Sequence, residues 1–62
     1  MQRGDRVRQR ATGWTGLVET VIPMFDDAGR PTGVELLVRW DRAPNALACV
    51  QEALVDHVPH DS

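Results

Sequence analysis

The segment VELLVRWD, residues 34–41, shows the most regular alternation of apolar and polar residues in the chain. Every second position in it is apolar: Val34, Leu36, Val38 and Trp40. Successive side chains of a β-strand point to opposite faces, so this pattern predicts a strand with one face in the core. Leu37, which lies between these positions, is then expected to point away from the core.

The other apolar segments are short and are separated by clusters of glycine, proline, aspartate and asparagine at residues 11–16, 26–33 and 42–45. Short apolar segments between turn-forming residues are typical of strands. The pattern predicts strands over 5–10, 16–25, 34–41, 46–50 and 54–58, with one helical turn over 51–53. Pro23 is expected to end or bend the second strand, because proline donates no ladder hydrogen bond.

Five short strands with one helical turn before the last predict an all-β fold. We expect a small five-stranded SH3-like barrel over residues 1–58, followed by a polar C-terminal tail, 59–62. Gly4 is expected to let the chain enter the first strand tightly. Gly13 and Gly16 are expected at the first hairpin turn, where positive φ or close backbone approach is common. Trp14 is expected at the mouth of the barrel.

The length and the cysteine count limit how such a domain is stabilised. A chain of 62 residues buries only about 60% of its unfolded surface, so something beyond the core must contribute. Cys49 is the only cysteine, which excludes an internal disulfide and favours a reducing compartment, the cytoplasm. No apolar run approaches the roughly 20 residues of a membrane span, and the arginine-rich start does not match a signal peptide. We therefore expect a cytoplasmic protein with no membrane contact.

Several motifs, spread over most of the chain, resemble a known family. They are Gly4-Asp5-Arg6-Val7-Arg8, Trp14 with Gly16 two residues on, Gly33-Val34-Glu35, and Ala53-Leu54. This arrangement resembles SH3-like barrels of the KOW type and is similar to the plasmid-encoded type II dihydrofolate reductases that confer trimethoprim resistance. The resemblance implies a homotetramer whose central pore binds NADPH and dihydrofolate.

The pore residues of that family are not retained. Its lysine, glutamine, isoleucine and tyrosine fall on Gln9, Leu47, Ala48 and Cys49. Hydride transfer requires hydrogen-bonding groups that hold the cofactor and the pterin, and these side chains do not supply them. Reductase activity with NADPH is therefore the alternative hypothesis, and the favoured one includes no catalytic residue and no cofactor.

Three arginines fall on one face of the first predicted strand: Arg6, Arg8 and Arg10. Their guanidinium groups could contact a ligand or phosphates, as in KOW-like nucleic-acid binders, which gives a third hypothesis. The net charge of −2, the absence of tyrosine and the single phenylalanine give little support for base stacking. The other interpretation is cross-strand pairing with acids on neighbouring strands: Glu19, Glu35 and Asp41.

The remaining polar candidates match ordinary structural roles. His57 and His60 have no third ligand nearby in sequence, and Asp26-Asp27 matches a turn, so no metal site is predicted. A lone cysteine such as Cys49 in an apolar strand usually packs as a small hydrophobe, and no catalytic constellation accompanies it.

Apolar surface is the most informative remaining feature. The segment 46–50 has apolar residues on both faces, and exposed patches of this kind commonly mark protein contacts. We expect a homo-oligomer, a dimer or tetramer, with these contacts: Leu37, Ala46, Leu47, Ala48, Cys49 and Val50. The first hypothesis is thus a non-enzymatic interaction module that self-associates and can also contact a protein partner.

Overall fold

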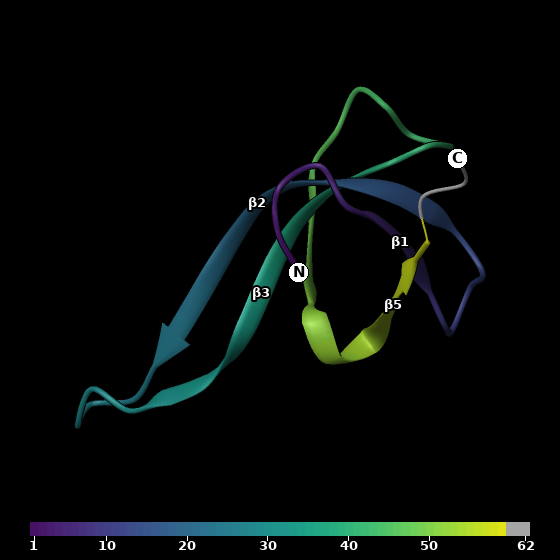
Figure 1. Ribbon diagram of the computed structural model, residues 1–62. Coiled ribbons are helices and arrows are strands. Elements are labelled where there is room, and N and C mark those ends of the chain that lie inside the picture. Colours follow the sequence, from purple (N-terminus) through teal and green to yellow (C-terminus); the bar gives the residue numbers. More distant parts are fainter. Residues whose placement is uncertain (60–62) are drawn as a thin grey trace.

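The computed structural model describes residues 1–59, which form one five-stranded antiparallel sheet (Figure 1). The elements in chain order are β1 (Arg6–Gln9), β2 (Thr15–Phe25), β3 (Pro31–Trp40), β4 (Ala48–Gln51), a 3₁₀ turn η1 (Glu52–Leu54) and β5 (Val55–Val58). The predicted all-β class and the single helical turn before the last strand are confirmed. No helix in residues 1–59 is long and apolar enough to cross a membrane.

The strands lie in the order β4-β3-β2-β1-β5, so β4 and β5 are the two edges of the sheet. No pairing joins these edges among the described residues, and the sheet is therefore not closed. η1 lies between the two edge strands along the chain. It leads the chain from one edge of the sheet to the other (Figure 1). The predicted strand bounds are correct to within a few residues.

The core lies on one face of the sheet. It consists of six buried apolar residues: Val7, Val18, Leu36, Val38, Trp40 and Val55. Three of them come from β3, which confirms the inward face predicted from its alternation. Val34, the fourth residue of that pattern, is only partly buried and packs against the edge of the core.

β2 departs from simple alternation at a β-bulge. Val18 pairs with Val38 but Thr20 pairs with Leu37, so Glu19 is an extra residue on its strand. A bulge of this kind shifts the side chains that follow by one position. Val18, before the bulge, is buried. Val21, three residues on and after the bulge, therefore packs against the same core.

The far ends of β2 and β3 form a two-stranded arm that extends beyond the rest of the sheet (Figure 1). On β2, β1 pairs only with Thr15–Leu17, and on β3, β4 pairs only with residues 35–38, so the outer part of the β2–β3 hairpin has no third strand. Pro23 lies in this arm and does not end β2, because a proline is tolerated where one side of the strand is unpaired. The molecule is accordingly elongated, with extents of 39 × 26 × 21 Å.

The tip of the arm is a short turn closed by Asp26. Its carboxylate accepts backbone N–H groups of Ala28 and Arg30 at 2.9 Å, and Gly29 supplies the positive φ of +79° that the turn requires. This confirms Asp26 as a turn residue. The loop is shorter than predicted, because β3 already begins at Pro31.

Candidate interaction surface

The outward side chains of β3 and β4 form the first candidate surface. Leu37 lies between Thr20 on one side and Cys49 on the other, and all three are directed away from the core. Leu37 is half-buried and Cys49 is exposed. Leu47, in the loop that precedes β4, has 48% of its surface exposed. An apolar surface therefore lies on and beside the edge strand.

The six residues predicted as contacts divide into two groups. Ala46, Leu47 and Cys49 are exposed, and Leu37 is half-buried on the outward face, whereas Ala48 and Val50 are half-buried on the inward face and pack against the core. Alternation along β4 explains the division, because Ala48 and Val50 pair with Val38 and Leu36, which point inward.

Cys49 does not pack as a small hydrophobe, so that expectation is wrong. Its thiol donates a hydrogen bond to Oε2 of Glu35 at 2.9 Å. This bond to a carboxylate raises the pKa of the Cys49 thiol, since it stabilises the protonated form. A thiol kept protonated is a poor nucleophile.

The arginine face is largely neutralised by neighbouring acids. Arg6 makes a two-point contact with Asp41, with Nη1 to Oδ1 at 3.0 Å, and Thr15 donates to the same carboxylate at 2.7 Å. Arg10, which lies just beyond β1, pairs with Asp56 at 2.9 Å and also donates to a backbone carbonyl.

Arg8 is exposed and is the one member of the predicted trio without an ion pair in residues 1–59. The cross-strand pairing predicted for Asp41 is confirmed. Glu19 instead pairs with Arg39, with its Oε2 3.2 Å from Nε. Glu35 contacts the thiol of Cys49. Of the three guanidinium groups that could contact a ligand or phosphates, only that of Arg8 has no ion pair among the described residues.

Trp14 covers the Trp40 end of the core. The two rings meet edge to face, with centroids 6.2 Å apart and planes at 76°. The guanidinium carbon of Arg42 lies 4.3 Å from the Trp14 ring centroid, in a cation–π arrangement. The Trp14 ring thus contacts Trp40 of the core and also carries the Arg42 guanidinium. We therefore assign Trp14 the role of shielding the core.

The histidine and pore positions that the structure describes do not lie together at one place in the sheet. His57 lies 3.8 Å from Asp5, and His60 lies outside the described residues. Residues 1–59 contain no group of three or more side chains that could hold a metal ion. Gln9, at the end of β1, accepts a hydrogen bond from Thr12, and two strands, β2 and β3, separate it from Cys49 on β4.

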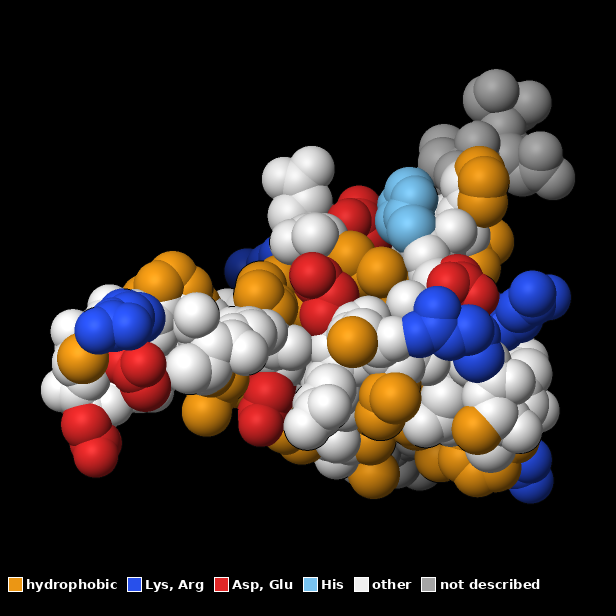
Figure 2. Space-filling view, turned by 90° about the horizontal axis from the view of Figure 1, so that it is seen from below, with side chains coloured by type: hydrophobic (Ala, Val, Ile, Leu, Met, Phe, Trp, Pro, Cys, Tyr) orange, Lys and Arg blue, Asp and Glu red, His pale blue; other side chains and the backbone are white. Residues whose placement is uncertain are grey.

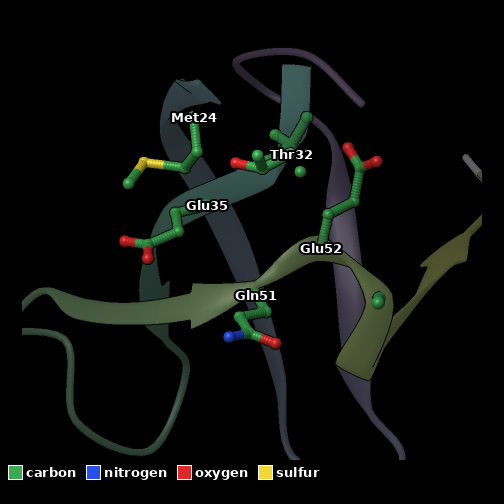
Figure 3. Close-up of a pocket in the computed structure, with 8 residues that line it drawn as sticks. Met24, Thr32, Glu35, Gln51 and Glu52 are labelled. Atoms are coloured by element: carbon green, nitrogen blue, oxygen red, sulfur yellow. The ribbon is translucent and has the colours of Figure 1, made fainter. Parts of the chain in front are cut away.

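A second surface, which the sequence did not predict, is a groove of about 460 Å³ along the edge of β3 (Figure 3). Thr32, Val34 and Glu35 line it from β3, and Gln51 and Glu52 line it from the point where the chain leaves β4 for η1. The groove exists because β3 is longer than β4. Residues 31–33 were expected to be part of a loop, so no signal in the sequence indicated an open edge there.

Asp41→Asn is expected to lower stability at neutral pH by about 0.5–1 kcal/mol, the range of exposed ion pairs, since both partners are more than a third exposed. The hydrogen bond from Arg6 holds the pKa of the Asp41 carboxyl below its ordinary value of 3.8, and the Thr15 bond adds to this. The folded-state pKa is lowered, so the contribution is present above pH 3.8 and is lost as the pH falls through the lowered value.

Thermal melting from pH 7 down to pH 2 measures this effect. The difference between parent and variant should be constant near neutrality and shrink in acid. Asp27→Asn, at an arm-tip acid without an ion pair in the described part of the chain, is the control and should follow the parent at every pH. A difference that persists unchanged in acid would contradict the assigned role of Asp41.

Comparison with known proteins adds no relative to these observations. No protein-family model, curated protein or solved structure matches the chain.

Proposed function

We propose that this chain is a non-enzymatic interaction module with an SH3-like barrel topology that associates with copies of itself. The observation that carries the proposal is the balance of apolar residues in the described structure. Six apolar residues are buried, and six large ones are exposed: Met1, Trp14, Met24, Phe25, Leu47 and Leu54. A core this small contributes little stability, so burying exposed apolar surface between copies is favourable at about 25 cal/mol per Å².

Figure 2 shows exposed hydrophobic side chains on both the arm and the body of the molecule, with charged side chains between them. Scattered single residues need no explanation, but Leu47 lies beside a free strand edge. β4 pairs with β3 alone, and its outer side has no partner in the described chain.

A second copy related by a two-fold axis fits this edge. Antiparallel pairing of β4 with its symmetry mate would satisfy the open backbone groups of both copies. Leu47 and Cys49 of each copy would then lie near the axis. This arrangement uses the surface members of the predicted contact set, Leu37, Ala46, Leu47 and Cys49, and leaves Ala48 and Val50 in the core.

The test is the oligomeric state. Sedimentation equilibrium of the parent at micromolar concentrations is expected to show a dimer or tetramer. Leu47→Arg should give a monomer, because like charges would meet at the axis. Leu54→Arg is the matched control, since Leu54 is equally exposed at 51% but lies on η1, and this variant should still associate.

A parent that remains a monomer over this range removes the proposal, and so does a Leu54→Arg variant that dissociates as fully as Leu47→Arg. The same preparations separate the reductase-like alternative. NADPH oxidation with dihydrofolate that exceeds background and is abolished by Leu47→Arg would replace the interaction module with an enzyme.

A further inference from the structure

The groove along β3 is an open strand edge. β4 pairs with β3 from Val38 to Glu35, and its last partner there is Gln51. Beyond that point the chain turns away as η1, while β3 continues back to Pro31. Residues 31–34 therefore pair with β2 on one side only.

Such an edge presents backbone hydrogen-bonding groups to whatever occupies the groove. In an antiparallel sheet the N–H and C=O of one residue both point to one side of the strand, and those of the next residue point to the other side. An extended segment placed in the groove would continue the line of β4 and pair with these groups, which is the way many domains bind a peptide strand. The groove holds about 460 Å³ and is bounded by the η1 turn on its far side (Figure 3).

The charge of the groove selects the occupant. Its charged lining residues are Glu35 and Glu52, and no arginine lines it. Figure 3 shows Glu35 beside Met24 and Glu52 across from them on the side of η1. The partner of Glu35 is a neutral thiol, so its negative charge is not compensated within the described residues.

The two glutamates come from different elements, Glu35 from β3 and Glu52 from η1, and lie on opposite sides of the groove (Figure 3). Met24 and Val34 add apolar surface to the lining, which suits the aliphatic part of a long basic side chain or its neighbours on a strand.

We propose that this groove binds an extended segment of a partner protein that carries an arginine or lysine side chain. The segment adds a strand to residues 31–34 of β3, and its basic side chain lies between Glu35 and Glu52. The groove lies on β3 beyond the end of β4, whereas self-association is proposed at the outer side of β4. Cys49, which bonds Glu35, adjoins both, so peptide binding is also measured in Leu47→Arg.

A pair of synthetic peptides tests the proposal. The first is acetyl-Gly-Ser-Thr-Val-Arg-Val-Thr-Ser-Gly-amide, and the second has glutamate in place of arginine. Each is titrated into ¹⁵N-labelled protein, both the parent and Leu47→Arg, so that binding is measured with and without self-association. The arginine peptide is expected to shift the amide resonances of residues 32–35 and 51–53 and to bind at least about tenfold more tightly than the glutamate peptide.

Two further measurements identify the contacts. The double variant Glu35→Gln with Glu52→Gln should remove the difference between the peptides, whereas the control Asp27→Asn should preserve it. A second copy of the arginine peptide carries N-methyl groups on the alternate residues whose N–H groups would face β3. It should not bind, because it cannot donate backbone hydrogen bonds to β3.

Three results would overturn the proposal. They are no shift with either peptide at millimolar concentration, equal affinities for the two peptides, and shifts confined to residues outside the groove, such as those around Trp14. The melting curve of the double variant checks that it folds. Both glutamates lie at the surface, so their loss should leave the core intact.

Discussion

Val38→Asp is expected to unfold the domain. Val38 is fully buried and lies between Val18 of β2 and Ala48 of β4, in the middle of the six-residue core. No basic side chain belongs to that core, so an aspartate there would be either an unpaired charge or a protonated acid without partners. The cost exceeds about 4 kcal/mol, which is comparable with the total stability of roughly 3–9 kcal/mol for a chain this short.

Circular dichroism and thermal melting at one fixed protein concentration measure the result. The matched control is Thr32→Asp, which places the same residue at an exposed position of the same strand and should change stability by no more than about 0.5 kcal/mol. If Val38→Asp melts as the parent does, the inward face of β3 is wrongly assigned.

The face of β3 was predictable because period-two alternation continues there over eight residues. No inward face was predicted for β2, and alternation alone would not have given one, because the bulge at Glu19 shifts the alternation and no residue type in TGLVETVI marks that position. The strand predicted over 16–25 already included Pro23, but that Pro23 does not end it depends on where β1 stops pairing, which the sequence does not show. Local pattern predicts which segments are strands, whereas the lengths of their neighbours decide which edges stay open.

The candidate surfaces depend on register in the same way. The arginines of the first strand were identified as one face, but which acids pair with them follows from the alignment of strands far apart in sequence. Asp41 reaches Arg6 because the end of β3 passes Thr15 on β2, whose carbonyl accepts the Asp41 N–H at 2.9 Å. The groove has the same origin, since it lies where β4 ends and β3 does not.

Gly16→Ala is the second change with a large expected effect. Gly16 was predicted at a turn, in a position of positive φ or of close backbone approach, and the structure places it within β2, opposite Val7 on one side and Trp40 on the other. Its φ is not in the positive region, so the close approach is the reason for glycine. A Cβ there would lie 2.7 Å from the carbonyl oxygen of Arg39 and 2.8 Å from a methyl group of Val38.

The nearest of these atoms belongs to the backbone of β3 and cannot rotate away, so β2 and β3 must separate to admit the methyl group. Overpacking of this kind lowers the free energy of unfolding by about 1–3 kcal/mol. Here it disturbs the pairing of the two longest strands. Gly29→Ala is the control for backbone conformation alone, because Gly29 has positive φ and nothing within 4 Å of an added Cβ. We expect its cost to be about 1 kcal/mol, below that of Gly16→Ala, when both are compared by denaturant unfolding. A Gly16→Ala variant as stable as the parent would mean that the two strands do not approach each other as closely as the structure places them.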